Sequence, residues 1–237
     1  MKDNNGRTKN SKFRQIRTVA AVNFKRATPV AYVLSGICAI AMIADIVIDK
    51  ITGNTGNSSL APYCMLYLVC VLSPVLISCV NYGKFINIGV NKKTFFYACA
   101  LNYAVYAAVI SFIATVERFT ADTLLGNGYN VYGIIDAFGW DGNFAAAYFS
   151  QFGFLLLVQT VVHTLAFMQN NAYGWAADIL IVVIISVFTP VRALRQAEIF
   201  FFNLVLFLPN VWTRTGICVL LSAAVYATNL IYLKKRR

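Results

Sequence analysis

Residues 61–116 hold two apolar runs around a basic loop: APYCMLYLVCVLSPVLISCV (61–80), NYGKFINIGVNKKT (81–94) and FFYACALNYAVYAAVISFIATV (95–116). Each run is long enough for a helix to cross the hydrocarbon core of a bilayer, which takes about 20 residues. The loop between them contains Lys84, Lys92 and Lys93. Because positive charge stays on the cytoplasmic side of a membrane, this stretch predicts a helical membrane hairpin whose loop faces the cytoplasm.

The whole chain has the composition of a membrane protein. Of its 237 residues, 59% are hydrophobic and 12% are charged, and its mean hydropathy is +0.66. Soluble domains carry about 25% charged residues, and a globular core of this size cannot bury so much apolar surface. We therefore expect a single all-α transmembrane domain over residues 1–237, with lipid as the solvent for much of it.

Positive charge is concentrated at three places in the chain. The net charge is +11, and 15 of the 20 Lys and Arg residues lie before residue 27, in the loop at 81–94, or at 234–237. They flank apolar segments, and no nucleic-acid-binding signature accompanies them. This pattern predicts orientation signals and contacts with membrane lipid rather than nucleic-acid binding. Both termini and the loop at 81–94 are thus predicted to be cytoplasmic.

Alternation between the two sides of the membrane predicts six transmembrane helices. Residues 1–28 would form a cytoplasmic tail and an amphipathic interfacial helix, which bends at Pro29 into the first span. The outer side would hold an acidic segment at 117–143, with Asp122, Asp136 and Asp141. The expected spans are 30–48, 61–80, 95–116, 144–168, 175–191 and 215–233, within a membrane domain at 29–233 that is followed by a basic cytoplasmic tail at 234–237.

Residues 199–209 are apolar but too few to cross the bilayer. A full crossing here would also place the basic residues at 234–237 on the outside, against the charge rule. We therefore expect a re-entrant or interfacial element on the outer side, before the last helix.

Signatures of catalysis are absent from the sequence. It has no Walker A pattern, no H-E-x-x-H, no G-x-S-x-G elbow, and one His in all. Its six cysteines form no C-x-x-C pair. We predict no catalytic residue, no metal site and no cofactor in this chain.

Several polar residues lie within or beside the predicted spans, where their desolvation is costly. Gln159 and His163 are four residues apart on one helical face, and His163 could pair with Asp178 across the connection at 169–174. With Asn102, these residues could line a pathway or gate, or could form hydrogen bonds that fix helix packing, at about 1 kcal/mol or less each.

A second polar group, Arg192, Arg195 and Glu198, has one-turn spacing ahead of the short apolar segment. These side chains could bind an anionic group on the outer side. Equally, they could hold the re-entrant turn at the membrane interface. The spacing favours neither interpretation.

The basic loop also carries a spaced pattern of aromatic, glycine and lysine residues: Phe85, Gly89, Val90, Lys92, Lys93 and Phe96. It resembles a pattern in type-2 ABC-exporter permeases of Gram-positive bacteria: Phe, three residues, Gly, then Val or Ala, then Ser, Thr or Asn, two basic residues, and Phe three positions later. Asn91 stands where Ser or Thr is commoner. The expected layout, with an amphipathic N-terminal helix and a short element before the last span, is similar to that family as well.

This resemblance implies a permease subunit in the bacterial cytoplasmic membrane, without an ATPase site of its own. In that family the loop is the coupling helix, which docks on a separate ATPase subunit. Two permease copies (or close paralogues) would work with two ATPase chains, which bind ATP and Mg, and would export an amphipathic or hydrophobic substrate such as a peptide or drug.

The residues of the loop themselves suit docking. Phe85, Ile86 and Phe96 would anchor it in a partner's cleft, while the lysines Lys84, Lys92 and Lys93 would meet an acidic rim. Two other interpretations stay open: a membrane scaffold or sensor that binds a partner without transport, and an intramembrane enzyme that acts on lipid.

Overall fold

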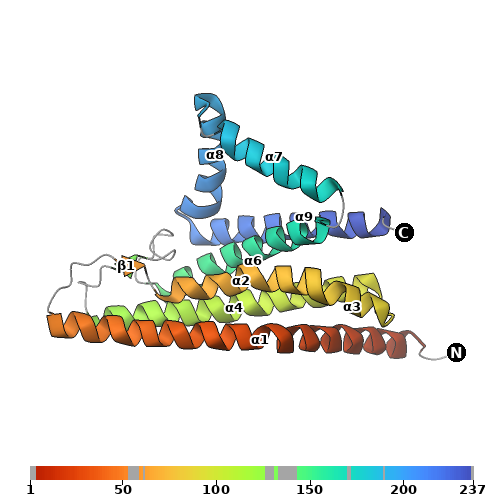
Figure 1. The fold of residues 1–237 in the computed structure, drawn as a ribbon, viewed down its shortest axis with the longest axis horizontal. Coiled ribbons are helices and arrows are strands. Elements are labelled where there is room, and N and C mark those ends of the chain that lie inside the picture. Colours follow the sequence, from red (N-terminus) through yellow and green to blue (C-terminus); the bar gives the residue numbers. More distant parts are fainter. Residues whose placement is uncertain are drawn as a thin grey trace.

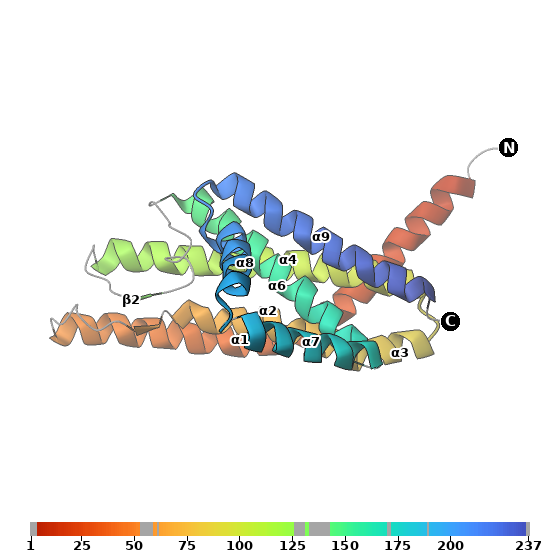
Figure 2. The same cartoon turned by 90° about the horizontal axis from the view of Figure 1, so that it is seen from above.

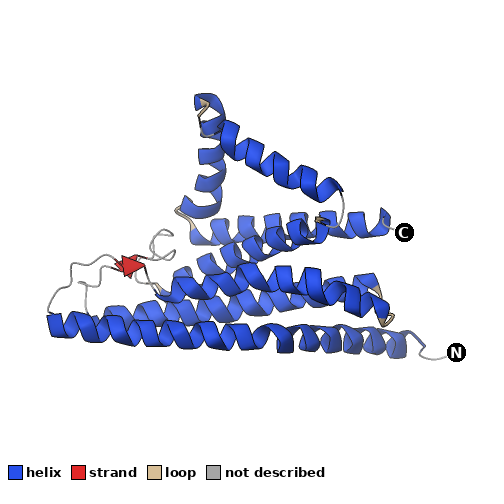
Figure 3. Ribbon diagram, viewed as in Figure 1, coloured by secondary structure: helices blue, strands red, loops and turns tan. Residues whose placement is uncertain are grey.

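The computed structural model describes residues 4–52, 59–60, 62–125, 131–132, 143–169, 172–188 and 190–235. A bundle of long helices dominates this part of the chain (Figure 1). It consists of α1 (Asn4–Thr52), α2 (Tyr67–Leu76), α4 (Lys92–Leu125), α6 (Phe144–Met168) and α9 (Val211–Lys235). The predicted all-α fold is thus confirmed for the described residues, apart from the two-residue pairing of β1 (Ser59–Leu60) with β2 (Val131–Tyr132) (Figure 3).

Four of the described helices are long and apolar enough to cross a membrane: Cys64–Asn87, Lys92–Thr120, Phe144–Met168 and Val211–Leu230. They contain most of the second, third, fourth and sixth predicted spans. The first and fifth predicted spans fall on α1 and α7 (Ala172–Phe188), whose described apolar stretches are shorter, Thr28–Ala41 and Gly174–Ile184. A membrane-embedded helical protein is therefore supported, and the count of six crossings stays a prediction.

Three basic segments that are far apart in the sequence gather at one end of the bundle. Figure 1 shows the first turns of α1, the short helix α3 (Tyr82–Asn87) and the last turns of α9 at the same end, and the β1–β2 pair at the other. We call the former the basic end. The orientation of the bundle in the membrane stays a prediction, and Asp136, Asp141, Arg236 and Arg237 lie outside the described residues.

The predicted amphipathic N-terminal helix is not a separate element. It is the first half of α1, which continues through Pro29, although Figure 2 shows this half at an angle to the rest. The Thr28 hydroxyl donates to the Phe24 carbonyl at 2.5 Å, as Ser and Thr do where proline interrupts a membrane helix. Val19 and Ala20 belong to one buried cluster with Phe85 and Phe95. This part of the apolar face therefore packs on protein, whereas Phe13 near the start of the helix is exposed.

Proline also marks the irregular part of the second predicted span. This span begins with a 3₁₀ segment, η1 (Pro62–Leu66), and α2 then contains Pro74. The missing N–H of Pro74 breaks the hydrogen-bond ladder, and the next segment, η2 (Ile77–Asn81), is a π-helix that leads into α3. Such π segments are local weak points of a helix.

The predicted re-entrant segment at 199–209 begins on α8 (Arg192–Phe202) and continues through the π segment η4 (Asn203–Phe207). In Figure 1, α7 leaves the bundle and α8 returns to it beside the start of α9. Val205 is buried there, in one cluster with Leu157 and Cys218. The segment therefore folds back onto the bundle, while its position relative to lipid stays a prediction.

Candidate functional site

The connection between α3 and α4 lies at the basic end and has a defined backbone. Gly89 has a φ of 83°, and its N–H donates to the Ile86 carbonyl at 2.9 Å, while the Val90 N–H donates to the Phe85 carbonyl at 3.0 Å. Val90 also packs against the cluster that contains Phe85. These bonds and this contact make a Schellman motif, a helix end that requires a left-handed residue. Gly89 is thus required for its backbone angle, since an added Cβ would meet nothing within 4 Å.

Asn91 begins the next helix. Its carbonyl accepts from the Phe95 N–H at 3.0 Å, and its side-chain oxygen accepts from the Lys93 N–H at 3.0 Å. This is N-capping, which Ser, Thr, Asp and Asn all provide. Asn91 therefore caps the helix as a Ser or Thr at this position would. We call residues 84–93 the tip, because a short turn joins two helices whose ends are both capped.

The helix dipole favours Lys84, which lies in the last turn of α3, but not Lys92 and Lys93, which begin α4. Lys84 and Lys93 are exposed and Lys92 is half-buried, and the first turn of α4 contains no acidic residue. A positive charge at a helix N-terminus opposes the helix dipole, at a cost of about 0.3–1 kcal/mol. Orientation in the membrane or an acidic partner would account for the exposed Lys93.

Phe85, in the tip, and Phe96, just after it, do not have the exposed positions that the predicted anchor role needs. Phe96 is 0% exposed; it packs against Phe167 and Tyr226, whose hydroxyl donates to the Phe96 carbonyl at 2.5 Å. Phe85 is also buried and lies against Phe95, with ring centroids 5.6 Å apart. Both side chains belong to the packing of this chain and are not available as anchors for a partner.

Ile88 is not among the predicted anchors of the loop, but it is the exposed apolar residue there. Its side chain is 74% exposed, next to Gly89 at the turn, whereas Ile86 is half-buried. Ile88 is therefore the most exposed apolar side chain of the tip. Its spacing gave no clear signal, because residues three and four apart share a helical face, and Ile88 stands three residues after Phe85 and four after Lys84.

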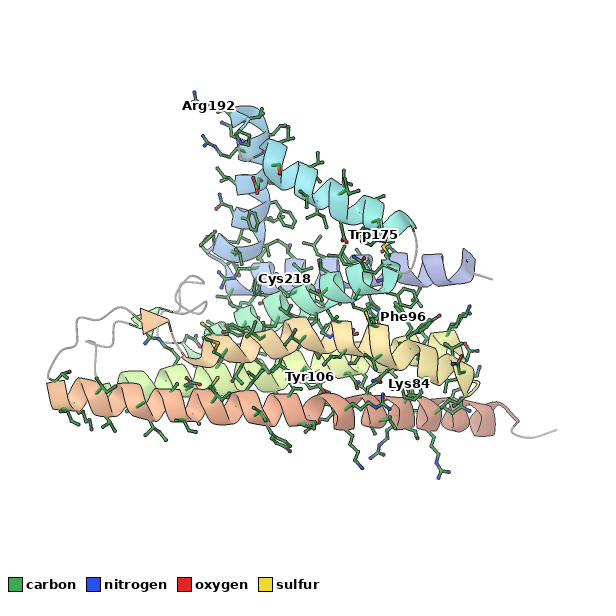
Figure 4. The ribbon with its side chains drawn as sticks, viewed as in Figure 1. Lys84, Phe96, Tyr106, Trp175, Arg192 and Cys218 are labelled. Carbon is green, nitrogen blue, oxygen red and sulfur yellow. The ribbon has the colours of Figure 1, made fainter. Side chains whose placement is uncertain are left out.

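A groove of about 650 Å³ separates the tip from α1. Figure 4 labels Lys84 on α3, beside the N-terminal half of α1. The groove has basic and polar edges and an apolar part, and its lining residues are Arg14, Gln15, Thr18, Val19, Ile88, Gly89, Val90 and Asn91. The tip and the start of α1 thus form one composite surface.

A hydrogen-bond network joins this surface to the membrane helices at the root of the tip. The Arg26 guanidinium donates to the Asn81 side-chain oxygen at 2.6 Å, and the Asn81 amide donates to the Asn23 side-chain oxygen at 2.8 Å. We call Asn23, Arg26 and Asn81 the root network. It ties α1 to the end of η2, directly before α3.

His163 and Asp178 have different partners, contrary to the expected pair. Nδ1 of His163 lies 2.7 Å from both the Ser78 hydroxyl and the Tyr103 hydroxyl, so α6 is joined to η2 and α4. Asp178 accepts from Gln169 instead. His163 and Asp178 are apart because of the fold. His163 faces the interior of the bundle, whereas Asp178 lies on α7, and α7 leaves the bundle.

Gln159 and Asn102 are buried as well. Gln159 lies beside the Cys70 thiol. Asn102 is 2% exposed and lies at the α1–α4 boundary, where its amide nitrogen has no hydrogen-bond partner in the part of the chain described. The two hydrogen bonds of His163 favour helix packing over a gate. The side-chain amide of Gln159, like the Asn102 amide nitrogen, is buried without a hydrogen-bond partner in the described chain, so these two residues do not favour packing.

The cluster of Arg192, Arg195 and Glu198 lies on α8, and both arginines are exposed. Figure 4 shows Arg192 at the corner where α7 meets α8, far from the bundle. The segment at 203–208 is held by another residue, Arg214, whose guanidinium donates to the Leu206 and Leu208 carbonyls at 3.1 Å. It also donates to the Ser150 hydroxyl at 2.5 Å.

Arg214 is not among the predicted site residues, because the last predicted span begins at residue 215. The signal was present, since an ionisable residue within an apolar stretch indicates a specific role. The described helix starts at Val211 and contains this arginine, whose side chain is 3% exposed.

Comparisons of the chain with protein-family models, with curated proteins and with solved structures found no match. Within the described residues, no group of His, Cys, Asp and Glu side chains could hold a metal ion. The family resemblance accordingly depends on residues 85–96 and on the layout of the helices.

Proposed function

We propose that this chain is the membrane-spanning permease subunit of an ATP-driven exporter in the bacterial cytoplasmic membrane. It would cross the membrane six times, with both termini and the tip in the cytoplasm. A second permease copy or close paralogue and two separate ATPase subunits, which bind ATP and Mg, would complete the transporter. The observation that carries this proposal is the gathering of three basic segments at one end of the bundle, around a capped tip with an exposed isoleucine.

A coupling element has to be stiff and has to offer a surface that a partner recognises. The Schellman motif at Gly89 and the N-cap at Asn91 supply the stiffness. Ile88 supplies an apolar centre, and Lys84 and Lys93 supply positive edges. Such a surface suits an apolar cleft with an acidic rim, because charge complementarity aligns partners and a buried apolar anchor holds them.

Movement of the tip would reach the membrane helices through its root. The root network links α1 to η2, so α3 and the first half of α1 would move together. The π segment at Ile77–Asn81 and Pro74 interrupt the regular helix just above. This segment would bend as the two ATPase subunits close, and alternating access would follow from two stable packings of the helices.

The substrate we propose is amphipathic or hydrophobic, such as a peptide or a drug-like compound. A pocket of about 270 Å³ between α1, η1 and α4 supports an apolar portion in the substrate. Its lining includes Leu66, Phe112 and Ile113, with Glu117 at its edge. These are the residues we would test first for substrate contact.

Co-purification tests the proposal. The chain is expressed with candidate ABC ATPase subunits from the same genome, starting with any that is encoded beside its gene, and assembly and substrate-stimulated ATP hydrolysis are measured. Ile88→Asp is expected to lower ATPase recovery at least tenfold, because it puts a charge at an apolar anchor. The matched control is Ile51→Asp, since Ile51 is 79% exposed at the other end of α1.

Two results would contradict the proposal. Full ATPase recovery with Ile88→Asp would remove the tip as the docking surface. Assembly without any substrate-stimulated ATP hydrolysis, over a panel of hydrophobic peptides and drugs, would favour a membrane scaffold over a transporter.

A further inference from the structure

A second groove lies on the face of α1 that borders α4, at the level where the basic half of α1 meets apolar surface. Its volume is about 400 Å³. It is lined by Arg17, Ala20, Ala21, Phe24, Lys25, Leu101, Asn102 and Val105. None of these residues belongs to the tip, so this groove is distinct from the docking surface described above.

The polar lining of this groove consists of hydrogen-bond donors. Arg17 and Lys25 are exposed and lie eight residues apart, about 12 Å along the helix. The lining contains no acidic residue. The Asn102 amide nitrogen is buried and has no hydrogen-bond partner in the described chain. Leaving a buried donor unsatisfied costs about 1–3 kcal/mol. A ligand that accepts a hydrogen bond from this amide would remove that cost.

The rest of the lining is apolar and continues towards the other end of the bundle. Phe24 forms the floor, where its ring stacks on Tyr106 at a centroid distance of 4.8 Å. Leu101, Val105 and Val109 follow at four-residue spacing on α4 and are all exposed. They form a stripe that leads from the cationic groups along the helix, away from the basic end.

The level of the groove fits the membrane interface. The helix α4 has 34 residues, about 51 Å at 1.5 Å per residue, against a hydrocarbon core of about 30 Å. One or both of its ends must therefore project from the core. Because the basic end carries the tip, the groove lies where headgroups would meet the first lipid-facing side chains.

We propose that this groove is a binding site for an anionic phospholipid. The phosphate lies between Arg17 and Lys25 and accepts from the Asn102 amide, and one acyl chain follows Leu101, Val105 and Val109. A second copy of this chain is disfavoured as the occupant, because a two-fold interface here would bring the same cations together. The proposal depends on membrane insertion and does not depend on transport.

Native mass spectrometry of the purified full chain in detergent tests this site, with dioleoyl phosphatidylglycerol as the probe. Arg17→Gln with Lys25→Gln is expected to weaken binding about 30-fold, from about a fivefold loss for each cation near a lipid surface. The charge-matched control, Lys12→Gln with Lys84→Gln, removes two exposed lysines of the basic end outside this groove and should leave binding within twofold.

The amide and the acyl chain are tested separately. Asn102→Asp keeps the side-chain volume, replaces the donor with a carboxylate and should abolish binding, while Asn102→Leu should weaken it about fivefold. Thermal unfolding of each variant in detergent establishes that it is folded. Dioleoyl phosphatidylcholine should bind far more weakly, and excess inorganic phosphate should not compete, because it lacks the acyl chains.

Three outcomes would contradict the proposed lipid-binding site. Equal losses in the two double variants would mean general attraction of the basic end for anionic lipid. Competition by inorganic phosphate would mean an anion site without lipid specificity. Dimers that dissociate in the Arg17→Gln, Lys25→Gln variant would mean that a second copy covers the groove. ATPase co-purification is measured on the Arg17→Gln, Lys25→Gln variant, which leaves every residue of the tip unchanged, so that failure of this site is distinguishable from failure of the docking proposal.

Discussion

The backbone conformation at residue 89 favours glycine over other residue types. Its φ of 83° lies in the left-handed region, where a Cβ clashes with the following carbonyl and costs roughly 1–2 kcal/mol. We predict that Gly89→Ala lowers the free energy of unfolding by about 1 kcal/mol. Gly89→Asn should lower it less, since Asn tolerates this conformation. Denaturant titration in detergent, followed by Trp fluorescence, gives the difference.

Gly83 provides the control for this change. It lies inside α3, is exposed, and would place a new Cβ in open space. Gly83→Ala should therefore raise the free energy of unfolding by about 0.5–1 kcal/mol, because Ala is the better helix former. The same substitution is thus expected to have opposite signs at two positions six residues apart. Equal destabilisation by both would show that the Schellman motif is not what constrains Gly89.

At the scale of elements, the root network is the contact between α1 and the end of η2 that the proposed coupling needs. A guanidinium that donates to a partly buried amide oxygen is worth about 1.5–3 kcal/mol. We predict a coupling energy of about 1–2 kcal/mol in a double-mutant cycle of Arg26→Ala and Asn81→Ala. Unfolding in detergent measures all four proteins of the cycle.

The neighbouring residue Lys25 provides a control double-mutant cycle. It is a cation on the same turn of α1, but it is exposed and faces the α1–α4 groove. Lys25→Ala with Asn81→Ala should therefore show a coupling energy near zero. If both cycles gave the same value, the effect would be long-range electrostatics, and Arg26 would not join α1 to η2.

The helices were predictable where an apolar run and a polar boundary coincide. The predicted fourth span has the bounds of α6, since Asn143 caps its start with bonds to the Ala145 and Ala146 N–H groups. The apolar run at 95–116 indicated only the apolar middle of α4, because the helix continues at both ends with polar residues. The continuity of α1 through Pro29 was not predictable, since contacts with α3 and α4 support it.

The candidate site was predictable as a backbone motif but not as a set of exposed side chains. The spacing of Gly89 and the lysines in the sequence predicted the loop that forms the tip. The burial of Phe96 could not be read from its neighbours, because Tyr226 and Phe167, which cover it, come from α9 and α6. Arg214 and Asn81 had partners 64 and 55 residues away. Contacts of this kind depend on how the helices pack.

At the scale of the whole molecule, part of the surface lacks a partner within the chain. Along α7 and α8, Trp175, Leu180, Val182 and Phe200 are largely exposed, and Figure 1 shows these helices standing away from the bundle. Apolar exposure of this extent in a membrane protein is expected against lipid or a second copy. This surface is where a permease dimer would acquire contacts that one chain cannot make.

Orientation of the bundle is the prediction on which the proposed function depends. Asn87 is exposed at the end of α3, and Asn143 is exposed at the opposite end, before α6. Each is replaced by Cys in a Cys79→Ala background, because Cys79 is the exposed native cysteine of the described chain. Positive charge resists translocation, so Asn87→Cys should react with a membrane-impermeant maleimide only after the cells are permeabilised. Asn143→Cys should react in intact cells.

The background protein, without a new cysteine, sets the labelling baseline from the remaining cysteines, which are buried or half-buried. Pre-treatment with a membrane-permeant maleimide should block the later signal at Asn87→Cys and so show that the residue is accessible from the cytoplasm. Labelling of Asn87→Cys in intact cells would place the tip outside, beyond the reach of any ATP-driven partner. The exporter proposal would then fail, whereas the Schellman motif and the root network, which depend only on packing, would stand.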